Sequence, residues 1–318
     1  MYKVVFLDQD TIPEHIQFRP LSFEHQWASF PTTSQEQLTE RLDGADIVIT
    51  NKVVLDASTL RNHPSIKLIA VSATGTNNVD LNYCQQQGVA VCNVQGYATQ
   101  SVPEHVIGML FALKRNLFAY HQDIQNGVWQ HKGQFCFFTH PIADIAGSIL
   151  AVVGSGSLGG AVGELAKALG MQVIYAERKG ASEARAGYVE FEQALKMADA
   201  VTLHCPLNEQ TQNLISEHEL SLMKPTSVLI NSGRGGLVEE ASLVDALLSN
   251  EIAGAGFDVF TQEPADENNP LIANAHLPNL LLTPHVAWGS DSAIQGLVDI
   301  LLDNIESFVA GGSHNRVV

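Results

Sequence analysis

Short apolar runs rich in valine and isoleucine alternate with longer stretches of helical periodicity along almost the whole of this 318-residue chain. This alternation predicts parallel strands joined by crossover helices, because such strands are buried on both faces and each helix carries the chain back. The predicted strands of the first part span residues 3–7, 47–50, 67–71 and 89–93. Those of the second part span residues 149–153, 172–176, 200–204, 227–231, 254–259 and 280–283. The sequence therefore predicts an α/β fold with two doubly wound parallel-sheet domains.

Two long helical patterns accompany these strands. Residues 101–125 begin with Ser101-Val-Pro-Glu104, the spacing of a capping box, in which the hydroxyl and the carboxylate satisfy free backbone amides. Residues 290–309 carry one apolar stripe, made of Ile294, Leu297, Val298, Leu301, Ile305 and Phe308. The stripe predicts an amphipathic helix near the C-terminus, and it leaves open which of the two sheets this helix covers.

The formal net charge of −17, from 34 acidic and 17 basic side chains, argues against nucleic acid or an anionic membrane surface as a partner. An anionic ligand would need locally concentrated positive charge or converging backbone amides. The four cysteines show no CxxC pair and no metal-ligand spacing with histidine, so we expect neither disulfides nor a metal site. No signal peptide or membrane-spanning run is recognisable, which favours a cytoplasmic protein.

A glycine pattern typical of dinucleotide binding follows the apolar run at 149–153. Gly154, Gly156 and Gly159 form a GxGxxG motif between a predicted strand and a predicted helix. The first glycine would permit the tight turn, the second the approach of a pyrophosphate, and the third close packing of helix on strand. The start of the helix would then offer free amides and the positive end of its dipole to the phosphates.

An acidic residue stands where the next predicted strand ends. Glu177 lies after residues 172–176, at the position where a carboxylate accepts hydrogen bonds from the adenosine ribose of NAD. Arg178 and Lys179 follow directly, and their charges could neutralise the 2′-phosphate of NADP. The pattern favours NAD(H) and does not exclude NADP(H).

Three residues suited to ketone reduction stand near the ends of predicted strands, the edge at which open α/β sheets bind ligands. His285 could donate a proton to a keto oxygen as hydride reaches the carbon, and Glu263 could orient the imidazole and stabilise its charged form. Arg234, flanked by glycines, could bind a carboxylate and the keto oxygen with its planar fork. Singly, each fits a structural role as well; together they predict a catalytic set.

The motifs VVGSGSLG at 152–159, NSGRGG at 231–236, DVFTQEP at 258–264 and TPHVAW at 283–288 resemble the D-isomer-specific 2-hydroxyacid dehydrogenase family. The similarity runs through nearly the whole chain and is greatest to the glycerate dehydrogenase, or hydroxypyruvate reductase, branch. It implies an NAD-binding Rossmann domain at 100–285, inserted in a flavodoxin-like substrate-binding domain at 1–99 and 286–318. The resemblance also implies a site in the cleft and a homodimer built largely by the nucleotide domain.

Site residues follow from this resemblance position by position. Arg234, Glu263 and His285 match the family's catalytic residues, and the amides of Thr74 and Gly75 match those of its substrate loop. Cofactor contacts are implied for Ser157, Leu158, Cys205, Pro206, Thr211, Ser232 and Asp258, the last near the nicotinamide carboxamide. Trp288 either forms part of the substrate pocket or is a buried packing aromatic.

The expected activity is NADH-linked reduction of hydroxypyruvate to D-glycerate, with glyoxylate as a second substrate giving glycolate. Another small 2-keto acid, such as pyruvate or a bulkier analogue, is the nearest alternative, because a methylene or two in an apolar pocket changes binding by only about 1–3 kcal/mol. A second alternative is a non-catalytic, NAD(H)-sensing protein like the corepressors related to this family.

Overall fold

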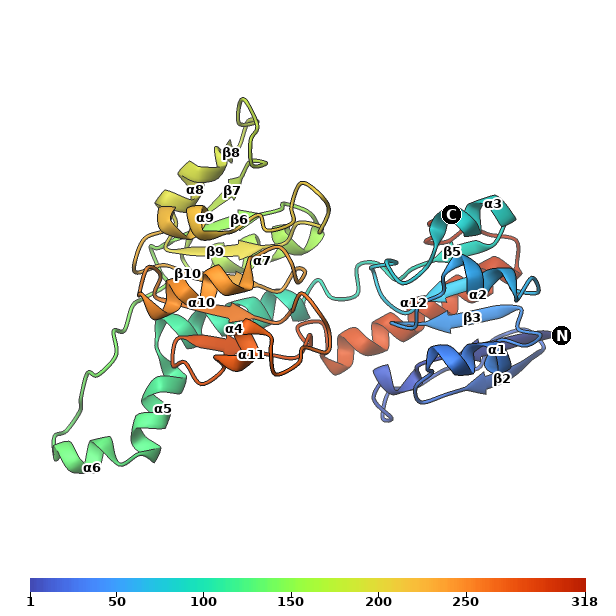
Figure 1. Ribbon diagram of the computed structural model, residues 1–318, viewed down its shortest axis with the longest axis horizontal. Helices are drawn as coiled ribbons and strands as arrows, with labels where there is room; N and C mark the ends of the chain where they lie inside the picture. Colours follow the sequence, from blue (N-terminus) through green and yellow to red (C-terminus); the bar gives the residue numbers. More distant parts are fainter. The chain divides into compact units, whose positions relative to one another are not determined.

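The chain folds into two compact units in the computed structural model, which describes residues 1–318. The first unit contains Met1–Ala98 and Gly289–Val318, and the second contains Thr99–Trp288. The chain therefore passes from the first unit to the second after residue 98 and returns after residue 288 (Figure 1).

A five-stranded parallel sheet forms the centre of the first unit, in the order β2-β1-β3-β4-β5. The strands are β1 (Tyr2–Phe6), β2 (His25–Ser29), β3 (Ile47–Thr50), β4 (Leu68–Val71) and β5 (Ala90–Cys92). The connections include the helices α1 (Leu38–Arg41), α2 (Ala57–Arg61) and α3 (Leu81–Gln87), with 3-10 turns at Gln9–Thr11 and Gln35–Gln37. This strand order is that of flavodoxin-like sheets.

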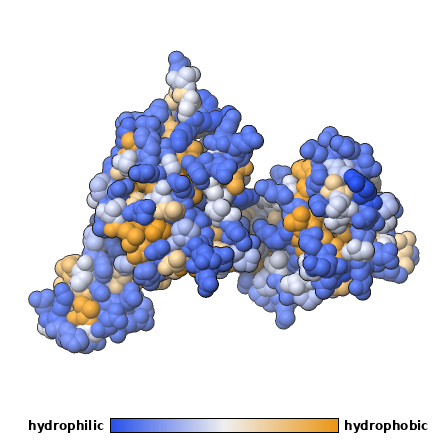
Figure 2. Space-filling model, in the orientation of Figure 1, coloured by the Kyte–Doolittle hydropathy of each residue, from blue (hydrophilic) through white to orange (hydrophobic).

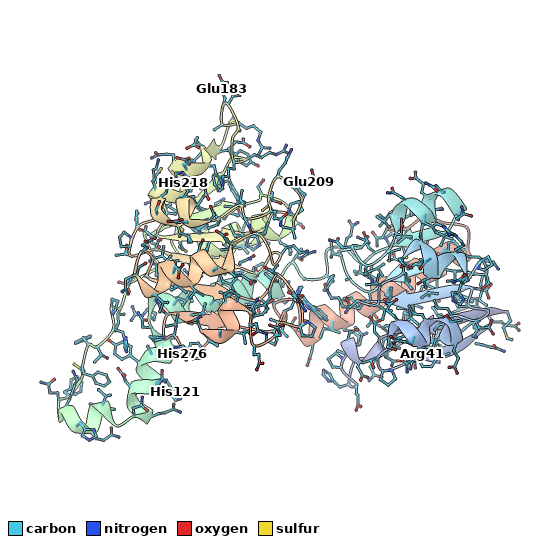
Figure 3. The ribbon with its side chains drawn as sticks, viewed as in Figure 1. Arg41, His121, Glu183, Glu209, His218 and His276 are labelled. Atoms are coloured by element: carbon cyan, nitrogen blue, oxygen red, sulfur yellow. The ribbon has the colours of Figure 1, made fainter.

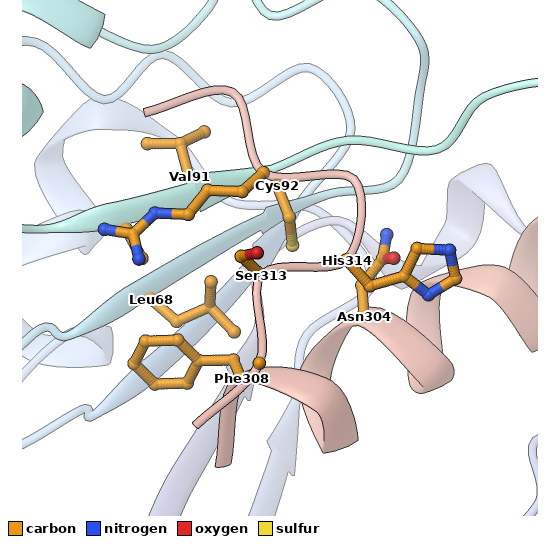
Figure 4. A pocket seen from close by; sticks show the side chains of 10 residues that line it. Leu68, Val91, Cys92, Asn304, Phe308, Ser313 and His314 are labelled. Atoms are coloured by element: carbon orange, nitrogen blue, oxygen red, sulfur yellow. The ribbon is translucent and has the colours of Figure 1, made fainter. Parts of the chain in front are cut away.

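The last helix, α12 (Asp291–Val309), belongs to the first unit and packs against β4. The structure thus settles which sheet the C-terminal helix covers. Beyond it, the chain crosses the free edge of β5, where Cys92 pairs with Arg316 in an antiparallel bridge. Figure 4 shows the hollow at this crossing, lined by side chains that include Val91, Asn304 and Phe308.

Seven parallel strands form the sheet of the second unit, in the order β12-β11-β10-β9-β6-β7-β8. They are β6 (Ile149–Val153), β7 (Gln172–Ala176), β8 (Tyr188–Val189), β9 (Ala200–Leu203), β10 (Val228–Asn231), β11 (Gly254–Phe257) and β12 (Leu280–Leu282). The helices are α4 (Ser101–Lys114), α5 (Leu117–Gln125), α6 (Val128–Lys132), α7 (Ser157–Ala168), α8 (Phe191–Met197), α9 (Glu217–Leu222), α10 (Glu240–Leu248) and α11 (Pro270–Ala273). The order is that of a Rossmann sheet, in which β6, the strand before the GxGxxG motif, lies next to the central strand β9.

The predicted helix at 101–125 is two helices, α4 and α5. The break lies at Asn116, whose backbone adopts a left-handed conformation with φ of 49°. The capping box predicted at Ser101 is also wrong, because no side chain caps α4 and the hydroxyl of Ser101 donates instead to the carbonyl oxygen of Ala287, 2.9 Å away. This bond ties the start of α4 to the segment after β12.

An arm made of α5, α6 and the following residues to 142 extends from the sheet of the second unit (Figure 1). It carries a set of exposed apolar side chains, and a hydrophobic cluster is visible on it in Figure 2. The exposed residues are Leu117, Phe118, Ile124, Trp129, Phe135, Phe138 and Ile142. No helix of the structure has the length and apolar character needed to cross a membrane.

Candidate active site

The glycine motif forms a tight connection between β6 and α7. Gly154 has φ of +97°, and a Cβ atom on it would lie 2.6 Å from the amide nitrogen of Cys205. A Cβ atom on Gly159 would lie 1.9 Å from the carbonyl oxygen of Gly154, whereas one on Gly156 would meet nothing within 4 Å. The first and third glycines are therefore required by the fold itself, and the second leaves open space beside the start of α7.

Free polar groups gather at this edge of the sheet. The helix α7 has no side-chain cap, so the amides of its first turn, which begins with Ser157 and Leu158, lack side-chain acceptors. Nδ1 of His204, after β9, and Oγ of Ser232, after β10, are buried without a hydrogen-bond partner. Burial lowers the pKa of His204 to about 4, so this imidazole is neutral at pH 7.

These features fit a bound dinucleotide. Orphaned buried donors and acceptors are rare in proteins, and they mark places where a ligand supplies the missing partner. A helix N-terminus with uncapped amides binds phosphate, and the space at Gly156 lets a pyrophosphate approach the backbone. Cys205 and Ser232, expected to touch the cofactor, lie at this same edge, following β9 and β10.

The other expected cofactor positions near Cys205 have structural partners. Thr211 donates its hydroxyl to the carbonyl oxygen of Pro206 at 2.7 Å, which closes the loop that follows β9. Burial raises the pKa of the Cys205 thiol, so it is protonated and unsuited to act as a nucleophile. These residues form a fixed wall beside Gly154.

Glu177, expected to bind the adenosine ribose, is engaged within the chain. Its Oε1 accepts a bond from the amide of Arg178 at 2.8 Å, and its Oε2 accepts from Nε and the amide of Arg185 at 2.7 and 3.0 Å. The Arg185 side chain, followed by these amides, lowers the pKa of Glu177 to about 2. The segment between β7 and β8, with Glu183 near its tip in Figure 3, is thus held back against Glu177.

The two cations after Glu177 differ in how they are used. Nζ of Lys179 lies 2.8 Å from the buried carboxylate of Glu219 and is committed to that pair. The side chain of Arg178 has no hydrogen bond or ion pair within the chain. Of the two residues that could bind a 2′-phosphate, only Arg178 is free to do so.

His285 and Glu263, far apart in sequence, form a hydrogen-bonded pair. Nδ1 of His285 lies 2.7 Å from Oε2 of Glu263, whose Oε1 accepts the amide of Phe260 at 3.0 Å. The side chain of His285 is 27% exposed, and its Nε2 has no partner in the chain. Nδ1 is therefore fixed by a carboxylate while Nε2 faces accessible space, the arrangement that an imidazole needs for proton transfer to a ligand.

The backbone around this imidazole is held in an unusual conformation. His285 has φ of 55°, and the indole nitrogen of Trp288 donates to its carbonyl oxygen at 2.9 Å. Trp288 is half-buried and supports the histidine through this bond. The sequence predicted either a place in the substrate pocket or a buried packing role for Trp288, and neither prediction included this bond.

Asp258, expected near the nicotinamide carboxamide, follows β11 and makes several hydrogen bonds within the chain. Its side chain is completely buried, with Oδ1 accepting the hydroxyl of Thr283 at 2.6 Å and the amide of Val286 at 2.8 Å. Oδ2 accepts the amide of Ala287 at 2.8 Å. The carboxylate thus accepts donors from both sides of His285 and supports the histidine segment.

Arg234 follows β10 and lies beside the segment that leads to Glu263. A Cβ atom on the next residue, Gly235, would lie 1.7 Å from the carbonyl oxygen of Phe260, so the two loops touch. The guanidinium donates to the carbonyl oxygen of Gly233 at 2.7 Å and has no carboxylate partner. Its positive charge is therefore available to an anionic ligand. The neighbouring strands β10, β11 and β12 thus carry Arg234, Glu263 and His285 at one edge.

Thr74 and Gly75 belong to the first unit, in the loop after β4. The hydroxyl of Thr74 donates to the carbonyl oxygen of Val94 at 2.8 Å, and its carbonyl oxygen accepts from the Asn93 side chain at 2.6 Å. The amides of Thr74 and Gly75 donate to no atom of the chain. Both amides are thus free to bind an anion.

Sequence reasoning missed His105 and Arg185, which support the site. Nε2 of His105, on α4, lies 3.1 Å from the hydroxyl of Thr283, the residue that also binds Asp258. Arg185 lies in a loop and comes next to Glu177 only through folding. No local pattern marks either residue, because their partners lie elsewhere in the chain.

The chain matches the family model for the NAD-binding domain of D-isomer-specific 2-hydroxyacid dehydrogenases over residues 107–287. It is 45% identical to a glycerate dehydrogenase of Methylorubrum extorquens, over 99% of this chain and 98% of the relative. It is 34% identical to a hydroxypyruvate reductase of Blautia hydrogenotrophica, over 90% of this chain and 88% of the relative. Among solved structures, the TT0316 protein of Thermus thermophilus matches with a TM-score of 0.84 at 27% identity, over 99% of this chain and 100% of that one.

Proposed function

The chain belongs to the D-isomer-specific 2-hydroxyacid dehydrogenase family, and on this premise we propose that it reduces hydroxypyruvate to D-glycerate, and glyoxylate to glycolate, with NADH. The observation that carries the proposal is the pair of Glu263 and His285, 2.7 Å apart, with Nε2 of the histidine free. The relatives named glycerate dehydrogenase and hydroxypyruvate reductase support an oxidoreductase of this type.

In the proposed reaction, bound NADH supplies a hydride to carbon 2 of the keto acid. His285 donates the proton on Nε2 to the keto oxygen, on which negative charge develops. Glu263 keeps Nδ1 protonated and stabilises the imidazolium before the transfer. Arg234 binds the substrate through its guanidinium, which has no carboxylate partner in the chain. A lysine at this position would supply only a point charge and not the planar fork of donors.

We assign the two units different tasks. The second unit, with the glycine motif, would bind the dinucleotide and provide the three catalytic side chains. The first unit would hold the substrate carboxylate on the free amides of Thr74 and Gly75. This division favours a small, anionic 2-keto acid over a neutral ketone, because both binding elements are positive or donate hydrogen bonds.

NADH is the proposed cofactor in preference to NADPH. Glu177 has a pKa of about 2 and is therefore negative at neutral pH, where it would repel a 2′-phosphate. Lys179 is committed to Glu219, which leaves Arg178 as the free cation at this place. The support for NADH therefore rests on the Glu177 carboxylate, whose charge is partly offset by Arg185, and the free Arg178 leaves some NADPH activity expected.

We also propose that two copies associate through the arm that carries α5 and α6. Its exposed aromatic side chains, Phe118, Trp129, Phe135 and Phe138, form an apolar surface on a chain whose net charge of −17 otherwise disfavours self-association. Burial of these rings in a symmetric contact would offset that repulsion.

Initial rates of NADH and NADPH oxidation with hydroxypyruvate, glyoxylate and pyruvate test the proposal directly. His285→Ala should lower kcat with hydroxypyruvate by at least about 100-fold, because it removes the proton donor. A matched control is His218→Ala, which removes an exposed histidine of the same unit (Figure 3) and should leave the rates unchanged.

A wild-type protein that oxidises NADH with none of the three keto acids would contradict the proposal. If the same protein bound NADH tightly, the nucleotide-sensing alternative would gain support. Fast turnover of pyruvate with slow turnover of hydroxypyruvate would support the same type of reaction, with pyruvate and not hydroxypyruvate as the preferred substrate.

A further inference from the structure

The loop that carries Glu263 has no regular secondary structure. It runs from the end of β11 at Phe257 to the start of α11 at Pro270, and residues 261–264 are exposed. Exposed loops of this kind move more than the strands and helices that they connect. The hydrogen bond between Glu263 and His285 nevertheless requires one fixed place for the Glu263 carboxylate. Another part of the chain must therefore hold the loop.

A buried carboxylate from another element binds this loop at two points. Glu240 is the first residue of α10 and is only 9% exposed. Its Oε1 accepts the amide of Thr261 at 2.8 Å, and its Oε2 accepts the side-chain amide of Asn269 at 2.7 Å. Asn269 in turn caps α11 by accepting the amide of Leu271 at 2.9 Å. The two oxygens of Glu240 thus hold the start and the end of the exposed part of the loop.

The peptide group between Phe260 and Thr261 is fixed on both of its sides. Its amide donates to Glu240, and its carbonyl oxygen lies against the backbone of Gly235, where a Cβ atom would come within 1.7 Å. The preceding amide, that of Phe260, donates to Oε1 of Glu263 at 3.0 Å. The bond made by Glu240 therefore lies one residue away from the backbone group that itself binds Glu263.

Glu240 and Gly235 both belong to the part of the chain that follows Arg234. Gly235 is the next residue, and Glu240 begins the helix after this segment. An ionised carboxylate makes stronger hydrogen bonds to amides than a neutral acceptor does, and its burial requires such partners. The segment that carries the guanidinium of Arg234 thus holds, through Glu240, the loop that carries the carboxylate of Glu263.

We propose that Glu240 is a positioning residue, which acts through the backbone of the loop to hold the Glu263 carboxylate on His285. The inference rests on the proposed function and adds to it a residue outside the set that would contact substrate or cofactor. Without the bonds of Glu240 the loop is freer, so Nδ1 of His285 loses its fixed partner and proton transfer slows. Arg234 precedes the loop and keeps its place, so substrate binding should change little.

The test is a double-mutant cycle on kcat for the reduction of hydroxypyruvate with NADH. Glu240→Leu has a similar size and accepts no hydrogen bond, so it should lower kcat about 10-fold and change KM less than about threefold. In a Glu263→Ala background the same change should lower kcat less than about twofold, because the carboxylate that Glu240 positions is already absent. A residue that only stabilises the fold would lower kcat by the same factor in both backgrounds.

A second variant covers the case in which Glu240→Leu does not fold. Glu240→Gln keeps one acceptor oxygen and loses the other, so kcat should fall about threefold, and this loss should likewise disappear in the Glu263→Ala background. The matched control is Glu239→Leu, at the preceding residue, whose exposed carboxylate accepts the Ser242 hydroxyl at 2.6 Å. It should leave kcat and KM unchanged.

Two results would overturn the role of Glu240 while leaving the proposed function standing. One is a wild-type kcat in Glu240→Leu, and the other is an equal loss of kcat with and without Glu263. A wild type inactive with every keto acid would overturn both the proposed function and this role, so the two failures are distinguishable.

Discussion

The carboxylate of Asp258 accepts a 2.8 Å hydrogen bond from the amide of Val286, the residue directly after His285. Bonds from the Thr283 hydroxyl and the Ala287 amide complete the set, so one buried side chain is bonded to residues before and after the proposed proton donor. A backbone with φ of 55° at a histidine is sparsely populated, and it persists only where its surroundings enforce it. The position of the imidazole therefore depends on Asp258.

Asp258→Asn should lower kcat with little change in KM for the keto acid. Asparagine keeps one acceptor oxygen, and its amide nitrogen cannot accept from a backbone amide, so the bond from either Val286 or Ala287 is lost. The segment then shifts and the imidazole leaves its working position. A displacement of about 1 Å costs on the order of 100-fold in rate. Steady-state kinetics measure the effect, with Asp245→Asn on the exposed side of α10 as control. A normal kcat would show that Asp258 does not position His285.

Several strands of the two sheets could be predicted from local sequence, and two others could not. Strands β3, β6 and β7 match their predicted bounds, because runs such as Ile149–Val153 have the apolar character of strands buried between helices. The GxGxxG motif sits, as predicted, between strand and helix. By contrast, β2 and β8 were missed, since a polar edge strand such as His25–Ser29 has no alternating pattern to reveal it.

The sequence could indicate which residues suit the proposed chemistry, but it could not indicate which residues hold them in place by hydrogen bonds. Arg234, Glu263 and His285 could be selected because their chemistry suits ketone reduction and each follows a predicted strand. The partners of Asp258 lie 25 to 29 residues away, and no sequence spacing encodes them. The bond from Arg185 to Glu177 also needs the loop to fold back.

Glu177→Ser should move cofactor preference toward NADPH. The change removes a charge that stays negative at neutral pH, because its pKa is about 2, and it releases Arg185 next to the free Arg178. The ratio of kcat/KM for NADPH to that for NADH should rise about tenfold. Glu183→Ser, near the tip of the same segment, is the matched control (Figure 3). An unchanged ratio would remove Glu177 from cofactor discrimination.

The double variant Phe118→Asp with Phe138→Asp should be monomeric. Two added charges on the exposed apolar surface of the arm oppose its burial against a second copy. Sedimentation analysis should give the chain mass of 34.4 kDa for the variant and twice that mass for the wild type. Leu248→Asp, which alters an exposed leucine on α10, should not change the wild-type mass. A monomeric wild type would contradict the proposed association.

His204 makes the stability of the second unit depend on pH. Its pKa lies at about 4 in the folded chain, against 6.5 ordinarily, because burial disfavours the charged ring. Above pH 6.5 the ring is neutral in both the folded and the unfolded chain, so it adds no pH dependence to the stability there. As the pH falls from 6.5 toward 4, only the unfolded chain takes up the proton, so stability falls and then levels off below about pH 4.

This linkage should lower the free energy of unfolding by about 2 kcal/mol between pH 7 and pH 5. In His204→Gln that part of the pH dependence should disappear, because glutamine does not titrate. Urea unfolding at the two pH values measures both differences, with His218→Gln as control for an exposed histidine that lies next to Glu192. If wild type and His204→Gln lost equal stability over this range, His204 would not be a neutral ring with a lowered pKa in the folded chain. Its ring would then be charged in the folded chain, and its Nδ1 would donate to a partner.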